Sequence, residues 1–117
     1  MKIRIKGNTL RYRLTRSEVA ALWENGRLEA QTVFTGNTLI YAIETAKDPM
    51  LSADFTGCSI VLSMPETMID ALYHTDQVGF EGVSGNIHLL VEKDFVCIDN
   101  TTEDQSDNYP NPSLTCD

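Results

Sequence analysis

Basic side chains alternate with apolar ones in two short runs near the start of the chain. Six of the nine Lys and Arg residues fall within the first 16 positions, which contain no Asp or Glu. Guanidinium groups bind carboxylates and phosphates through paired hydrogen bonds, so a cluster of them indicates an anion-binding site. The candidate residues for such a site are Arg4, Arg11, Arg13, Lys2 and Lys6.

These bases lie on two predicted strands, residues 2–6 and 9–14, which are joined by Gly7-Asn8. Alternation of apolar and polar residues is typical of strands, and Gly adopts the positive φ that a two-residue hairpin turn requires. This turn places Arg4 opposite Arg11 and makes one face of the hairpin basic and the other apolar. Like charges opposite one another destabilise a sheet unless something neutralises them.

The basic face has two interpretations. In the first, it binds an external anion, either an anionic small molecule or an acidic segment of a partner protein. In the second, it is neutralised within the chain, by Glu29 or Glu44 on neighbouring strands or by the acidic C-terminal segment folding back. Exposed charged faces are common in antiparallel sheets, which favours the second interpretation.

A second group of residues with metal-binding chemistry lies near the end of the last predicted strand: His88, Glu92, Asp94 and Cys97. Strand alternation puts Glu92 and Asp94 on the same side as His88 but not Cys97. Because no closely spaced Cys or His pair is present, this is a weak zinc signal, and we expect no metal or cofactor. The simpler interpretation of Glu92-Lys93-Asp94 is a solvated strand end.

Motifs of common enzyme classes are missing from the chain. It contains no phosphate-binding loop, no Gly-x-Ser-x-Gly and no Gly-x-Gly-x-x-Gly. With only two His residues, acid-base catalysis would fall mainly on Asp, Glu or Tyr12, and no pair has a spacing that demands it. His74 is predicted near the end of a helix, in a structural role. We therefore assign no catalytic residue.

Composition favours one domain with a real hydrophobic core. The chain has 117 residues, of which 42% are hydrophobic, and a net charge of −8. An acidic protein repels phosphate backbones, which argues against nucleic acid and anionic membranes as partners. No apolar run is long enough to cross a bilayer and no signal peptide opens the chain, so a cytoplasmic location is expected.

The three Cys residues, at positions 58, 97 and 116, have no metal-binding spacing. An odd number of Cys without an export signal favours reduced thiols. A disulfide between Cys97 and Cys116 is the alternative, and it would need an oxidising compartment.

The order of predicted elements repeats once along the chain. Thr15-Arg16-Ser17-Glu18 forms a capping box that starts a helix, and two strands joined at Gly36-Asn37 follow it. At an offset of 50, Gly7 falls on Gly57, and the binary pattern recurs through a hairpin, a helix that starts at Pro65-Glu66 and a last hairpin. The turn of that hairpin, Gly85-Asn86, is displaced by one position, and chance alignment of two hydrophobic patterns is the alternative explanation.

The predicted fold is therefore α+β. Two ββαββ repeats, residues 1–48 and 49–98, would form one curved, mainly antiparallel sheet or open barrel with two helices packed on it and a pseudo-two-fold axis. SHS2-type folds are similar in topology. Residues 99–117 carry five acids, two Pro and no base, and they are predicted to be a largely irregular tail.

The opening run MKIRIKGNTLRYRLTRSEV and the later VEKDFVC resemble a family of small, functionally uncharacterised bacterial proteins. The resemblance covers nearly the whole chain and implies a short single-domain protein, without site residues to transfer. The residues themselves favour a small binding or protein-interaction module that uses the basic face, with a homodimer through an open sheet edge as a further expectation. The alternative is a small metal-dependent protein or enzyme with its site around His88 to Cys97.

Overall fold

The structure of the protein is a computed structural model that describes residues 1–95 and 106–110. The predicted order of two strands, a helix and two strands is present twice. The first set is β1 (Lys2–Lys6), β2 (Thr9–Leu14), α1 (Arg16–Asn25), β3 (Arg27–Phe34) and β4 (Asn37–Ala46). The second set is β5 (Ser52–Thr56), β6 (Ser59–Pro65), α2 (Glu66–His74), β7 (Gly79–Ser84) and β8 (Ile87–Lys93).

The first hairpin has the predicted register. Arg4 pairs with Arg11 and Ile5 pairs with Leu10, and Gly7 in the turn has a φ of 53°. The second turn differs from its prediction, because the last pair of β3 and β4 joins Phe34 to Asn37 and leaves Thr35 and Gly36 as the turn. Asn37 is thus the first residue of a strand rather than part of the loop.

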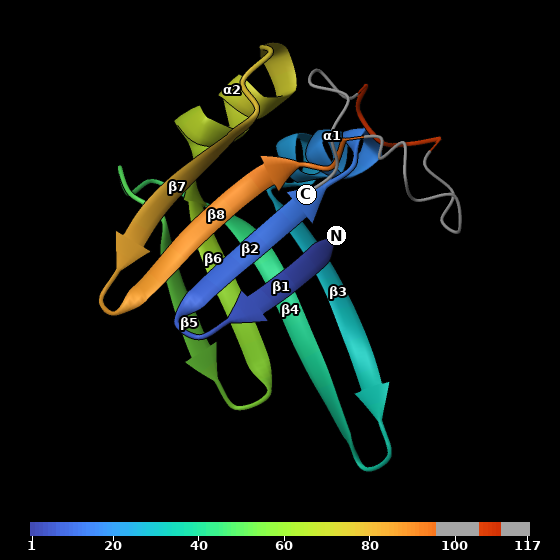
Figure 1. The fold of residues 1–117 in the computed structure, drawn as a ribbon, viewed down its shortest axis with the longest axis vertical. Helices are drawn as coiled ribbons and strands as arrows, with labels where there is room; N and C mark the ends of the chain where they lie inside the picture. The colour runs from blue at the N-terminus through green and yellow to red at the C-terminus, as the bar shows by residue number, and fades with distance from the viewer. Residues whose placement is uncertain (96–105, 111–117) are drawn as a thin grey trace.

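The strands form two four-stranded sheets instead of the single curved sheet or open barrel that was expected. Sheet A has the order β1-β2-β8-β7, and sheet B has the order β3-β4-β6-β5. The hairpins are antiparallel, but the central pairs β2 with β8 and β4 with β6 are parallel, so both sheets are mixed. Each sheet therefore combines one hairpin from each half of the chain (Figure 1).

Both helices lie at the end of the sheets opposite the hairpin turns (Figure 1). The start of α1 is the predicted capping box, in which the Thr15 hydroxyl accepts from the Glu18 amide and the Glu18 carboxylate accepts from the Thr15 amide. Gly26 ends this helix in the left-handed region, with a φ of 74°. α1 packs against β3, α2 packs against β6, and the helices contact each other.

The core fills the space between the two sheets and under the helices. The alternate residues of the central strands that face inward are its main component, together with one side of each helix. The fully buried side chains with the largest volumes are Tyr12, Leu14, Leu22, Ile43, Leu62, Met64, Ile69, Leu72, Leu89, Val19 and Val91. The structure describes no helix that is long and apolar enough to cross a membrane.

Tyr12 is the polar exception in this core. Its side chain is fully buried, and its hydroxyl has no hydrogen-bond partner among the described residues. Burial raises the pKa of Tyr12 to about 12 from the ordinary value of 10.0. Because the folded state disfavours the ionised phenol, the free energy of unfolding has its full value below pH 10 and falls as the pH rises from 10 through 12.

Replacing Tyr12 with Phe is expected to remove this alkaline sensitivity. The wild-type protein should lose roughly 2–3 kcal/mol of unfolding free energy between about pH 10 and 12 beyond what the variant loses. At neutral pH the variant should be at least as stable as the wild type, because it buries no unpaired hydroxyl. Urea unfolding of both proteins at several pH values tests this expectation. Parallel pH profiles for the two proteins would contradict it.

Residues 106–110 lie against the start of α1 and the end of β8. The Arg16 amide donates to the Asp107 carbonyl at 3.2 Å, and the Tyr109 amide donates to the Asp94 carbonyl at 2.9 Å. The Ser17 hydroxyl donates to the Asp107 carboxylate and lowers the pKa of that carboxyl. This part of the C-terminal segment thus packs on the domain, and the other residues of the predicted tail lie outside the described ranges.

Candidate functional site

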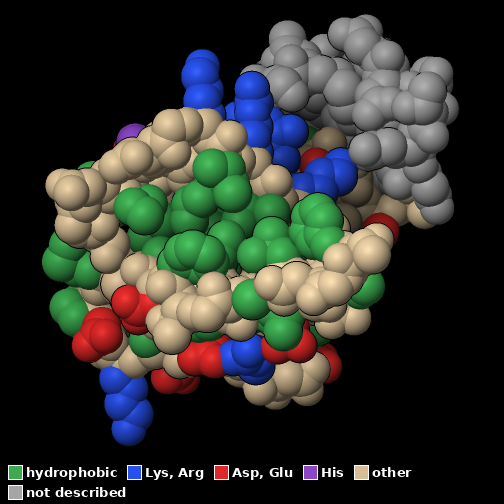
Figure 2. Space-filling view, turned by 90° about the horizontal axis from the view of Figure 1, so that it is seen from below, with side chains coloured by type: hydrophobic (Ala, Val, Ile, Leu, Met, Phe, Trp, Pro, Cys, Tyr) green, Lys and Arg blue, Asp and Glu red, His purple; other side chains and the backbone are tan. Residues whose placement is uncertain are grey.

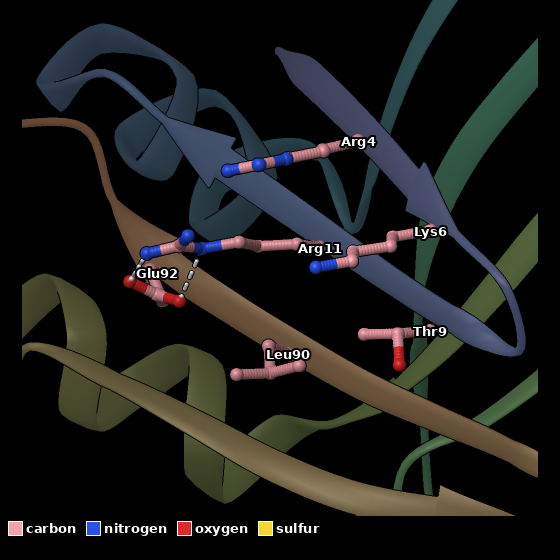
Figure 3. A pocket seen from close by; sticks show the side chains of 6 residues that line it. All are labelled: Arg4, Lys6, Thr9, Arg11, Leu90 and Glu92. Carbon is pink, nitrogen blue, oxygen red and sulfur yellow. Dashed lines mark hydrogen bonds and ion pairs between the residues drawn. The ribbon is translucent and has the colours of Figure 1, made fainter. Parts of the chain in front are cut away.

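A groove on the outer face of sheet A contains three of the predicted anion-binding residues. Its volume is about 410 Å³, and it is lined by Arg4, Lys6, Thr9, Arg11, Leu90 and Glu92. The lining side chains come from β1, β2 and β8, and the three cationic ones point in the same direction across β2 towards β8 (Figure 3). Leu90 provides an apolar surface beside them.

Arg11 is held in place by a carboxylate from a distant part of the sequence. Its Nε donates to Glu92 Oε1 at 2.8 Å and its Nη2 donates to Glu92 Oε2 at 3.1 Å (Figure 3). The parallel pairing of β2 with β8, which places Arg11 beside Leu90, brings Glu92 within reach. Both side chains are about one-fifth exposed, so this two-point contact orients the guanidinium group in a partly buried setting.

Arg4 and Lys6 line the same groove without such a partner. Among the described residues, neither side chain forms an ion pair or a side-chain hydrogen bond. Arg4 stands directly opposite Arg11, and Lys6 stands opposite Thr9. Since Glu92 already neutralises Arg11, two positive charges of the groove remain uncompensated by the described part of the chain.

The other two predicted bases lie away from the groove. Lys2 Nζ forms an ion pair with Asp94 Oδ2 at 3.1 Å, and the Asp94 side chain is only 6% exposed. Arg13 stands opposite Lys2 at the far end of the hairpin, has an interaction of its own, and does not line the groove. The structure therefore narrows the five predicted residues to three that share one groove.

The prediction that Glu29 or Glu44 neutralises the basic face of the first hairpin is wrong. Glu29 and Glu44 belong to sheet B, where both form ion pairs with Arg27. They cannot compensate the bases of sheet A, because the two hairpins lie in different sheets. The described part of the acidic C-terminal segment, residues 106–110, contacts the start of α1 and the end of β8 and does not line the groove.

The predicted metal-binding residues are held by separate partners. His88 Nε2 lies 3.2 Å from Glu81, Glu92 binds Arg11, and Asp94 binds Lys2. Cys97 lies outside the described residues. Within residues 1–95 and 106–110, no three His, Cys, Asp or Glu side chains come together as metal ligands would. The structure thus gives His88, Glu92 and Asp94 separate partners rather than bringing them together.

The end of β8 is buried, in contrast to the solvated strand end that was predicted. Lys93 is 7% and Asp94 is 5% exposed. Lys93 Nζ donates to the Thr75 carbonyl at 2.9 Å and lies over the Tyr109 ring, and burial lowers the pKa of this Lys. These contacts make the strand end a structural junction between α2, β8 and residues 106–110.

His74 is the last residue of α2, where the sequence predicted it. Its Nδ1 lies 2.7 Å from Asp70 Oδ1, one helical turn earlier. Its ring also makes edge contacts with Trp23 and Tyr73, whose rings stack at a centroid distance of 5.8 Å. This aromatic group joins the two helices and supports the structural role.

Comparison of the chain with protein families finds a family model that matches residues 1–113. Comparisons with curated proteins and with solved structures find no match. The matched model spans both hairpin-helix-hairpin halves and every residue of the groove. This protein thus belongs to a family of unknown function, DUF7009.

Proposed function

We propose that the protein is a binding module for a small anion, which it holds in the groove on the outer face of sheet A. The observation that carries this proposal is the pair Arg4 and Lys6, two cations that line a groove and have no ionic partner among the described residues. Like charges that face one another cost stability unless an opposite charge sits between them. Glu92 is already paired with Arg11, so an anion bound by Arg4 and Lys6 supplies the charge that is missing from the groove.

The groove favours a carboxylate or phosphate group on a compact molecule. Its volume of about 410 Å³ falls within the range of small-molecule sites. Arg4 offers paired donors, Lys6 offers a point charge, and the Thr9 hydroxyl adds a neutral donor. Glu92 limits the site to one side, because its carboxylate would repel an anion that moved towards β8. Leu90 gives an apolar portion of the ligand a surface to contact.

Calorimetric titration with inorganic phosphate and with citrate at low ionic strength tests the proposal. Arg4→Ala and Lys6→Ala should each weaken binding roughly ten- to a hundredfold, because a charge-assisted hydrogen bond contributes roughly 1.5–3 kcal/mol. Arg27→Ala is the matched control, because it removes one base from sheet B, where the guanidinium group already binds Glu29 and Glu44. This control should bind as the wild type does.

The same titration distinguishes the other outcomes. Equal affinity of all four proteins would remove the groove as the site. Binding of a Glu-rich peptide without binding of phosphate or citrate would transfer the site to an acidic protein segment and overturn the small-anion proposal. Binding should also weaken as salt is added, because these side chains are accessible to solvent ions.

We further infer that the chain consists of one ββαββ unit used twice. Exchanging the strands of one half for those of the other converts the order β1-β2-β8-β7 into β5-β6-β4-β3, which is sheet B read from its other edge. The turn-closing pairs also recur at an offset of 50, as Lys6 with Thr9 and Thr56 with Ser59. The parallel pairs follow this offset less closely. Leu10 pairs with Leu89, and its equivalent Ile60 pairs with Tyr41, which lies two positions after the equivalent of Leu89. These relations support a pseudo-two-fold axis between the halves.

A further inference from the structure

The outer face of sheet A changes from basic to apolar and acidic along the direction that crosses its strands. Two adjacent rows of paired residues, each followed from β1 through β2 and β8 to β7, consist of Arg4, Arg11, Leu90 and Glu81, and of Lys6, Thr9, His88 and Val83. Figure 2, which views the molecule from the end with the hairpin turns, shows most of the visible Lys and Arg side chains projecting from the edge that sheet A forms. The anion-binding groove lies on the part of this face that β1, β2 and β8 form.

Leu90 and Val83 form the apolar part of this face. Leu90 is half-buried and lines the groove, whereas Val83 on the neighbouring strand is 58% exposed. Their positions in adjacent rows of paired strands make them diagonal neighbours, which lie close enough for their side chains to form one surface. A ligand whose apolar part covers this surface removes it from water and binds more tightly for that reason. The groove therefore continues, beyond its cations, into a surface that favours an apolar part of a ligand.

Two carboxylates limit the charge that a ligand can carry on the side of β8 and β7. They belong to Glu92 and Glu81, the acids among the paired residues of this face. Glu92 binds Arg11, and Glu81 lies 3.2 Å from His88 Nε2 with 67% of its side chain exposed. A ligand whose first carboxylate is bound by the β1 cations of the groove would bring a second one towards these acids, and like charges oppose that approach. The face therefore favours a single negative charge at one end of the ligand.

We propose that the ligand of this groove is a monocarboxylate with a short apolar body, either aromatic or branched. Its carboxylate binds Arg4 and Lys6, and its body lies on Leu90 and extends towards Val83. β2 and β7 are two strand spacings apart, about 10 Å, so a body of the size of a phenyl ring reaches from the cations across Leu90. This inference rests on the proposed function, because it needs an anion at Arg4 and Lys6. A phosphate ion would leave the apolar surface uncovered.

Calorimetric titration of the full chain with phenylacetate and with acetate tests the inference. Phenylacetate should bind the wild type about tenfold more tightly, because its ring covers apolar surface that acetate leaves in water. Leu90→Ser should make the two affinities nearly equal, because it removes the apolar contact. Val33→Ser is the matched control, because Val33 is 70% exposed on the outer face of sheet B, and it should keep the affinity ratio of the wild type. Circular dichroism checks that both variants are folded.

A third probe tests the limit to one charge. Phenylacetate with an additional carboxylate in the para position has the same ring but a second negative charge at its far end. It should bind the wild type several-fold more weakly than phenylacetate, because that charge approaches Glu81 and Glu92. Tighter binding of this doubly charged probe would overturn the limit to one charge.

The remaining outcomes separate this inference from the proposed function. Equal affinities of the wild type for phenylacetate and acetate would overturn the inference, and so would an unchanged affinity ratio in Leu90→Ser. Either result leaves the proposed function in place as long as phosphate binds the wild type and Arg4→Ala weakens that binding. If neither phosphate nor phenylacetate binds, both proposals fail.

Discussion

Truncating Leu22 or Leu72 to Ala should lower the free energy of unfolding by roughly 2–5 kcal/mol each. The Leu22 and Leu72 side chains are 0% and 1% exposed, and they place α1 and α2 on the same core. Removing either leaves a cavity where helices and sheets meet, and close-packed interiors relax only partly around such a void. Urea denaturation, with m-values compared to confirm two-state unfolding, measures the loss.

The two substitutions together also test the repeated unit. Leu22 and Leu72 are 50 positions apart and occupy the same face of their respective helices. If one unit is used twice, the two losses should agree within about 1 kcal/mol, because the two sites have similar surroundings. Val33→Ala is the control, since this side chain is 70% exposed and its truncation should change stability by less than about 0.5 kcal/mol. A near-neutral Leu72→Ala would mean that α2 is not packed on the core as described.

Local chemistry explains why the hairpins and helix starts were predictable. A Gly at the turn and strict alternation on both sides leave one register for β1 and β2, since a slip by one residue would expose the whole apolar face. The capping box of Thr15 and Glu18 is likewise a signal contained within four residues. The sequence predicts the turn between β3 and β4 one residue too late along the chain. The reason is that Gly36, whose φ is 97°, occupies the second position of the turn rather than the first.

The arrangement of the hairpins in space was not predictable in the same way. Alternation defines an inner and an outer face for each strand, but it contains no information on which hairpins become neighbours. The parallel pairing of β2 with β8 joins segments about 80 residues apart, and no turn or local motif marks it. For this reason one sheet was expected where there are two.

The lack of information about which strands become neighbours also explains why the sequence predicted the bases of the groove but not their partners. The bases of the groove were identifiable from alternation alone, whereas their partners depend on contacts between distant strands. Glu92 belongs to the strand that pairs with β2 and so binds Arg11, whereas Glu29 and Glu44 are in the other sheet. Asp94 is buried because residues 106–110 and the first strand pack around the end of β8. Sequence spacing describes the faces of a strand but not what covers them.

A second large effect is expected at the start of β7, where Gly79 pairs with Glu92. A Cβ at position 79 would lie 2.4 Å from the Val91 carbonyl oxygen and 3.0 Å from Glu92 Cα. Both contacts are with backbone, which cannot rotate away as a side chain can. Gly79→Ala must therefore push β7 away from β8, and overpacking of this kind costs roughly 1–3 kcal/mol or more.

Gly82→Ala is the control for Gly79→Ala in the same strand. Its Cβ would lie 3.4 Å from Leu51 Cβ, an ordinary contact, so stability should change by less than about 1 kcal/mol, with a gain from the less flexible unfolded chain. The Gly79 variant also crowds Glu92 Cγ at 3.1 Å, and Glu92 holds Arg11. Phosphate affinity should consequently change in Gly79→Ala and stay constant in Gly82→Ala. Equal stability and equal affinity of the two variants would show that β7 does not approach β8 closely at this position.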